Sequence, residues 1–153
     1  MLPALVLWLV TANFSGNWVI AQDRTTLAAR PRVVANLSGI LGEKFTAIQN
    51  ERALTLDIST SALPKPVHVV YNLDGSESRN LNPGPSPAIE GEPIFSRASW
   101  EQDRLVIQTR GTALVNGKPQ ASKRVMWIDA DGFLHIERSS EGATTTVSVY
   151  KKS

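Results

Sequence analysis

The chain has 153 residues and a formal net charge of +2, and it contains no cysteine. Such a length suits one domain with a substantial hydrophobic core and is short for two, while the missing cysteine excludes disulfides, thiolate metal sites and cysteine nucleophiles. Lysine and arginine are spread along the chain instead of forming the basic block typical of nucleic-acid binding, so we expect a single domain without a nucleic-acid partner.

The N-terminal segment is apolar. Residues 1–12 (MLPALVLWLVTA) contain one polar residue, Thr11, and Val10-Thr11-Ala12 has the small-x-Ala pattern of a signal-peptidase site. The run is well short of the roughly 20 apolar residues that span a bilayer, and the usual positively charged start is missing. We expect a signal peptide over residues 1–12 with a truncated or misassigned beginning, one β-barrel domain over residues 13–153, and a periplasmic or secreted location. The alternative is an N-terminal strand or apolar stub.

Beyond this segment, short runs rich in Val, Ile, Thr and aromatic residues alternate with turn signals. Gly16 precedes a first strand in which Trp18 and Ile20 share a face. Residues 23–42 contain Pro31 and two glycines and are expected to be irregular. Further strands are predicted over residues 44–50, 53–60, 68–73, 76–81, 94–100, 104–114, 120–128, 133–139 and 144–152.

Tight turns join most of these strands. Asp74-Gly75, Asn116-Gly117, Asp131-Gly132 and Glu141-Gly142 are signals of the kind that close β-hairpins, whereas residues 82–93 contain four prolines and must form a surface loop. A meander of this many antiparallel strands exposes its edges unless it closes on itself. The sequence therefore predicts an all-β fold, an antiparallel up-and-down meander closing into a barrel of about 8 to 10 strands.

Several segments form a recognisable set: Phe14-Ser15-Gly16-Asn17-Trp18, GEKFT at 42–46, YNLDGSESRN at 71–80, SRASW at 96–100 with LVI at 105–107, and VYKK at 149–152. Together they resemble a group of small exported bacterial proteins with a lipocalin-like β-barrel. The resemblance covers nearly all of residues 13–153. It implies a lipocalin-like barrel and brings no catalytic residues with it, so a ligand has to be argued from the site itself.

The last predicted strand permits one comparison with intracellular fatty-acid-binding proteins, which have a similar ten-stranded shape. Those proteins hold the ligand carboxylate partly through an Arg-x-Tyr element in the last strand. The corresponding run here is Ser148-Val149-Tyr150, which has the tyrosine but not the arginine. This difference argues against that mode of carboxylate binding in this chain.

Aromatic and charged residues within the predicted strands are the candidates for a ligand site. Arg97 shares a face with Phe95, and Arg124 shares a face with Met126, so each guanidinium is placed to orient an acidic ligand from a partly apolar side. The alternative is that the charged side chains face solvent and the aromatic side chains fill a packed core. The predicted ligand-binding residues are Trp18, Tyr71, Arg97, Trp100, Arg124, Trp127 and His135.

The sequence contains no familiar catalytic, cofactor-binding or metal-binding motif. His68 and His135 are the only histidines, and a structural role is expected for both, although His135 shares a strand face with Glu137. Asp129-x-Asp131-Gly132 fails as a calcium loop, because aligning its glycine with that of an EF-hand places tryptophan first and arginine last. We therefore expect a β-turn there, and no catalysis, cofactor or metal.

These observations favour an exported, non-catalytic β-barrel that binds a small apolar or amphipathic ligand, with residues 82–93 gating the mouth and residues 23–42 as a second candidate gate. One alternative is a structural or protein-interaction barrel with a filled core and no ligand. Another is an enzyme, which would require His135 and Glu137 to share a water-accessible cavity. The oligomeric state and the identity of the ligand stay open at this level.

Overall fold

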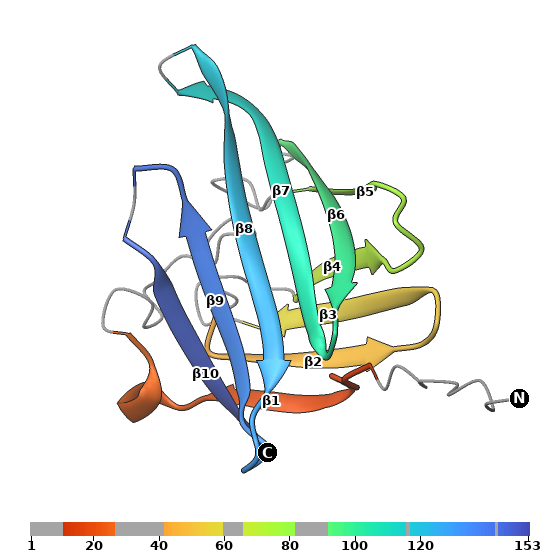
Figure 1. Cartoon of the computed structure of the whole chain (residues 1–153), viewed down its shortest axis with the longest axis vertical. Coiled ribbons are helices and arrows are strands. Elements are labelled where there is room, and N and C mark those ends of the chain that lie inside the picture. The colour runs from red at the N-terminus through yellow and green to blue at the C-terminus, as the bar shows by residue number, and fades with distance from the viewer. Residues whose placement is uncertain (1–10, 27–41, 60–65, 82–91, 116, 143) are drawn as a thin grey trace, which may run out of the picture.

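Ten strands among the described residues form one antiparallel sheet in the computed structural model (Figure 1). The structure describes residues 11–26, 42–59, 66–81, 92–115, 117–142 and 144–153. A short 3-10 helix, η1 (Gln22–Arg24), follows the first strand. The strands are β1 (Gly16–Ile20), β2 (Lys44–Gln49), β3 (Ala53–Ser59), β4 (Val67–Asn72), β5 (Ser78–Leu81), β6 (Pro93–Glu101), β7 (Arg104–Val115), β8 (Lys118–Ile128), β9 (Leu134–Ser140) and β10 (Thr146–Lys152).

The strands follow one another as an up-and-down meander. Their order in the sheet is β4-β3-β2-β1-β10-β9-β8-β7-β6-β5, so β1 and β10 pair and join the two ends of the chain. In Figure 1, β2 and β3 lie across the direction of β7 and β8, and the sheet curls into a nearly closed barrel. We call β1 to β4 the first wall and β5 to β10 the second wall. The all-β barrel predicted from the sequence is confirmed.

Side chains alternate between the interior and the outer surface, as the period of two in a strand requires. In β3, Leu54, Leu56 and Ile58 are buried, while Thr55 and the other intervening side chains are only partly so. This alternation continues around the barrel and collects the apolar side chains into one core. Fully buried members of that core include Phe14, Trp18, Leu54, Leu56, Tyr71, Leu105, Ile107, Met126, Leu134 and Tyr150.

The two sheet edges, β4 and β5, meet through side chains. The Asp74-Gly75 signal predicts a hairpin, but among the described residues no backbone ladder joins β4 to β5. Instead, the Val70 N–H donates to Asn80 Oδ1 at 3.0 Å, and Asn80 Nδ2 donates to the Val70 carbonyl at 3.0 Å. The Asn72 N–H donates to Ser78 Oγ at 2.7 Å. We call this contact the seam; it satisfies edge groups that a hairpin would otherwise pair.

Residues 12–15 close one end of the barrel. The side chain of Gln49, at the end of β2, accepts the Phe14 N–H at 2.8 Å and donates to the Ala12 carbonyl at 2.9 Å. Phe14 is fully buried, and its ring stacks on Trp100 with centroids 5.9 Å apart. The Trp18 indole N–H donates to the Phe14 carbonyl at 2.8 Å. We call this the closed end.

Several sequence predictions fall on residues outside those described. They are most of the signal peptide (residues 1–10), most of the first candidate gate (82–91) and most of the second (27–41). Within the described ranges, no helix has the length and apolar character to cross a membrane.

Candidate functional site

The barrel interior is largely apolar and carries one polar band away from the closed end. The inward side chains of the first wall are apolar there, including Ile20, Phe45, Ile58 and Val69. The second wall instead presents a row of hydroxyl groups, because strand pairing places serine or threonine side by side from β5 to β9. The row consists of Ser78, Ser96, Thr109, Ser122 and Ser140. We call it the hydroxyl row.

Part of the hydroxyl row is deeply buried and internally bonded. Ser96 is 2% exposed and Thr109 is 8% exposed. Their hydroxyl oxygens lie 2.8 Å apart in a hydrogen bond. Each hydroxyl also keeps acceptor capacity, so the hydroxyl row is a polar band among apolar side chains of the second wall such as Ile94, Ile107 and Leu134.

Two arginines lie next to the hydroxyl row. Arg124 on β8 and Arg138 on β9 are directly opposite each other in the register, one inward position from Ser122 and Ser140. Arg124 is 2% exposed, and its Nη1 crosses the interior to donate to the Tyr71 hydroxyl on β4 at 3.2 Å. Both arginines make further interactions within the chain. We call them the arginine pair.

The arginine pair affects the titration of its neighbourhood. Burial lowers the pKa of Arg138, and the positive charge of Arg124 lowers it further. Arginine nevertheless stays protonated in proteins because its ordinary pKa is so high. Burial also raises the pKa of Tyr150, an effect that Arg124 only partly offsets. The buried charge of Arg124 and the partly buried charge of Arg138 therefore lie in the same barrel as a neutral phenol, whose O–H donates to the Gly42 carbonyl at 2.9 Å.

Four of the predicted ligand-binding residues lie in or beside the interior. Trp18, Tyr71 and Arg124 point inward and are buried. Trp100 lies at the closed end, where it is partly buried and stacks on Phe14. Tyr71 and Arg124 bond each other near the polar face, whereas the two tryptophans belong to the apolar closed end.

The other three predicted residues lie outside the wall. Arg97 is exposed, and its Nη1 donates to the Gly75 carbonyl at 2.9 Å. Trp127 faces outward because Met126, its neighbour in β8, faces the core. Its ring stacks on His135 with centroids 5.0 Å apart, and the Arg104 guanidinium lies 4.3 Å from its centroid. Trp127, Arg97 and His135 therefore lie on the outside of the wall, and ligand binding by these three residues stays a prediction.

The β8–β9 turn explains the position of His135. Asp129 Oδ1 accepts the N–H groups of Asp131 and Phe133 at 2.9 and 3.0 Å, which confirms the predicted β-turn. Asp129 Oδ2 lies 2.7 Å from His135 Nε2. This hydrogen bond is the main reason that the pKa of Asp129 is lowered. The partner of His135 is thus Asp129, on the outer surface, although Glu137 shares that face.

The described residues contain no group of three or more His, Asp or Glu side chains that could bind a metal ion. His68, the second histidine, bonds Asp57 at 2.7 Å on the exposed face of the first wall. Both histidines therefore sit in pairs with a single carboxylate.

Sequence reasoning missed Arg138 and the hydroxyl row. Arg138 follows Leu134 and Ile136 at intervals of two, so alternation within β9 would have placed it inside. The hydroxyl row has no signal within any single strand. It arises from pairing across β5 to β9, and register is not readable from one strand alone.

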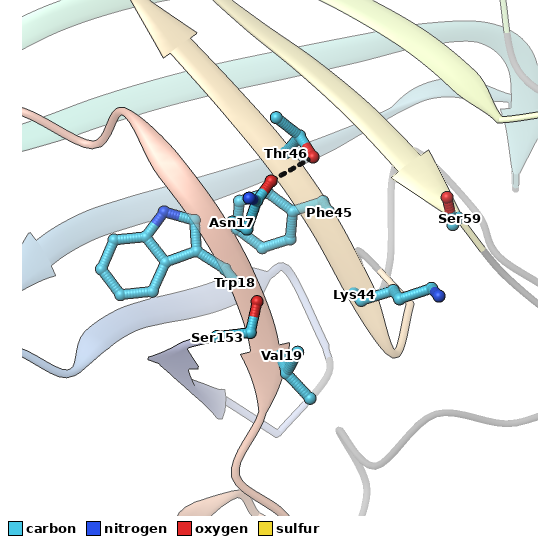
Figure 2. A pocket seen from close by; sticks show the side chains of 8 residues that line it. All are labelled: Asn17, Trp18, Val19, Lys44, Phe45, Thr46, Ser59 and Ser153. Atoms are coloured by element: carbon cyan, nitrogen blue, oxygen red, sulfur yellow. Dashed lines mark hydrogen bonds between the residues drawn. The ribbon is translucent and has the colours of Figure 1, made fainter.

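A surface pocket of about 280 Å³ lies on the outside of the first wall (Figure 2). Figure 2 shows Asn17 from β1 and Thr46 from β2 side by side, joined by a hydrogen bond of 2.7 Å, with Lys44 and Ser59 to one side. These side chains alternate with the buried Trp18 and Phe45. The pocket is therefore separate from the barrel interior and from the arginine pair.

Comparison with models of known protein families finds no match, and comparison with curated protein sequences finds none either.

Proposed function

We propose that this chain is an exported, non-catalytic barrel of lipocalin-like type that binds one small amphipathic molecule in its interior. The observation that carries the proposal is a band of polar side chains within an otherwise apolar interior. Apolar side chains from β1 to β4 face the hydroxyl row and the arginine pair on β5 to β9. An amphipathic molecule presents the same two kinds of surface, and ligand sites in barrels combine apolar lining with a few placed polar groups.

The export part of the proposal rests on the sequence. The apolar residues 1–12 end in a small-x-Ala pattern, and a chain without cysteine needs no redox control in an oxidising compartment. The non-catalytic part rests on His135, whose ring is held by Asp129 on the outer surface, away from the interior in which we place the ligand.

A second candidate is a structural or protein-interaction barrel with a filled core. The observation that favours it is the complete burial of the large side chains around the closed end, where Phe14, Trp18 and Leu105 are all 0% exposed. In that case the hydroxyl row and the arginine pair would serve only to satisfy one another, and the function would belong to the outer surface.

Native mass spectrometry separates the two candidates. The chain is expressed with residues 1–12 in a bacterial host, purified, and weighed under native conditions before and after organic extraction. We expect a stoichiometric adduct of small mass that extraction removes, together with cleavage of the N-terminal segment. The extracted barrel is then titrated with dodecanoate and dodecan-1-ol while tryptophan fluorescence is followed.

A protein that carries no adduct and binds neither compound contradicts the ligand-binding proposal and favours the filled barrel. A full-length chain retained in the cytoplasm contradicts the export proposal and leaves the ligand-binding proposal unaffected. The matched control is the same titration of the urea-unfolded protein, which measures any binding that does not need the barrel.

A further inference from the structure

We propose that the outer face of β5 to β8 docks on the surface of an anionic lipid bilayer, which it contacts through exposed arginine and lysine side chains. This inference concerns the outside of the barrel. It goes beyond the proposed function and needs neither a ligand nor a cavity in the interior. A protein that binds in this way lies on the bilayer and does not span it.

The sheet register gathers four cationic residues in two neighbouring cross-strand rows. Arg79 and Arg110 belong to the first row, and Arg97 and Lys123 belong to the second, with one residue between the two cations of each row. All four side chains are exposed, and their strands are consecutive neighbours in the sheet (Figure 1). We call these four residues the basic face. Because each comes from a different strand, their spacing along the chain does not show a basic block.

The basic face has an excess of positive charge. Glu77 lies 3.2 Å from Arg110 Nη2 and 4.0 Å from Arg97 Nε, and no other carboxylate of the described residues forms an ion pair with the face. Four positive charges and one negative charge leave +3 on this surface. The whole chain has a formal net charge of +2, so the remaining residues together carry −1. The charge excess of the molecule is therefore concentrated on β5 to β8.

The spacing of the basic face suits several lipid headgroups at once. Neighbouring strands lie about 4.8 Å apart, so the face spans roughly 15 Å from β5 to β8. Each lysine or arginine near an anionic membrane surface contributes about 1 kcal/mol, which is about fivefold in affinity. This attraction acts within about 10 Å at moderate salt, so side chains that project from one sheet face can all contribute.

Apolar side chains beside the cations favour a bilayer over another anionic partner. Leu81 is 36% exposed, and it shares the outer side of β5 with Arg79 by the period of two. Phe95 of β6 is partly exposed, and its ring centroid lies 4.5 Å from Arg110 Cζ. Interfacial segments bury such apolar groups at the headgroup and acyl boundary while cations contact the phosphates. A nucleic acid would use the cations without needing Leu81.

The test measures co-sedimentation of the purified full chain with lipid vesicles. The vesicles contain either equal parts of phosphatidylglycerol and phosphatidylcholine or phosphatidylcholine alone, and the second kind reports any binding through apolar residues 1–12. Double-stranded DNA is the third probe.

Three variants separate the basic face from general charge. The double variant Arg79→Gln with Lys123→Gln removes two cations that form no ion pair with a described residue. The matched control, Lys44→Gln with Arg52→Gln, removes the same charge from exposed positions of the first wall. Leu81→Ser removes the exposed apolar side chain and keeps the charge. Circular dichroism checks that each variant is folded.

We expect native protein to bind the phosphatidylglycerol vesicles, to bind phosphatidylcholine much more weakly, and to lose the difference as salt is added. The Arg79→Gln, Lys123→Gln variant should bind about twentyfold more weakly, and the first-wall control should change by less than about threefold because its charges face away from the bilayer. Leu81→Ser should weaken vesicle binding by at least about threefold and leave any binding of DNA unchanged.

Equal losses in the two double variants overturn the inference, because general charge and not the basic face then explains binding. Native protein that does not distinguish the two kinds of vesicle also overturns it. Binding of DNA that depends on Arg79 and Lys123, without binding of vesicles, assigns the face to a nucleic acid instead. None of these results depends on whether the interior holds a ligand, so the proposed function is tested separately.

Discussion

At the scale of single residues, Tyr150 on β10 bonds the backbone just before β2. Its hydroxyl donates to the Gly42 carbonyl at 2.9 Å, and both residues are buried. We predict that Tyr150→Phe lowers the free energy of unfolding by about 1–3 kcal/mol at neutral pH, because the variant leaves a buried carbonyl without its donor. Urea denaturation followed by circular dichroism measures this loss.

The same residue gives a pH dependence with a definite sign. Burial raises the pKa of Tyr150 above its ordinary value of 10.0, so the folded state holds this proton more tightly than the unfolded state. Its contribution to stability is fully present below the unfolded pKa and falls as the pH rises above it. The stability gap between native protein and Tyr150→Phe should therefore narrow in alkaline solution. Tyr71, the only other tyrosine, is present in both proteins, and a gap that stays constant with pH contradicts the prediction.

At the scale of elements, the seam between β4 and β5 depends on Asn80. Its amide group bonds both the N–H and the carbonyl of Val70, as a neighbouring strand would. We predict that Asn80→Ala lowers the free energy of unfolding by about 1–3 kcal/mol, since these edge groups then lack their partner in a poorly hydrated place. Hydrogen exchange should show faster exchange of the Val70 amide, with the β1–β10 amides much less affected.

Arg79 provides the matched control for the seam. It precedes Asn80 in β5 but is exposed, so Arg79→Ala should change stability by less than about 0.5 kcal/mol. Equal losses in the two variants, or unchanged exchange at Val70, would show that the barrel does not rely on the Asn80 amide for closure.

At the scale of the whole molecule, much of the barrel is readable from local patterns. Alternation in β3 predicts that Leu54 and Ile58 face inward and Thr55 outward, and the structure confirms this. The Asp131-Gly132 signal predicts the β8–β9 turn, where Gly132 has a φ of 86°, a left-handed value that suits glycine. Both features depend on a few neighbouring residues, so sequence reasoning reaches them.

Features that depend on which strands pair cannot be predicted from such local patterns. Trp127 is large and aromatic, which favours the interior, yet its neighbour Met126 occupies the inward position and Arg104 covers the indole outside. The arginine pair requires the register of β8 against β9. The seam requires β4 and β5 to be the two edges of a nearly closed sheet, whereas the Asp74-Gly75 signal alone predicts a hairpin between them.

Closure of the barrel also depends on residues outside every strand. Phe14 fills one end of the barrel, where it is 0% exposed and stacks on Trp100. We predict that Phe14→Ala lowers the free energy of unfolding by about 3–5 kcal/mol, whereas Phe14→Leu, which keeps most of the volume, costs less than about 1.5 kcal/mol. Urea denaturation measures both losses, and tryptophan emission should shift to the red in the alanine variant.

Ile48 is the control for this prediction. It is a large apolar residue near the same end of β2 but is 59% exposed, so Ile48→Ala should change stability by less than about 0.5 kcal/mol. A Phe14→Ala variant as stable as Ile48→Ala would mean that the ten-stranded sheet closes this end without residues 12–15. A large loss confined to Phe14 would instead make this short segment part of the core, joined to β2 through Gln49 as firmly as a strand.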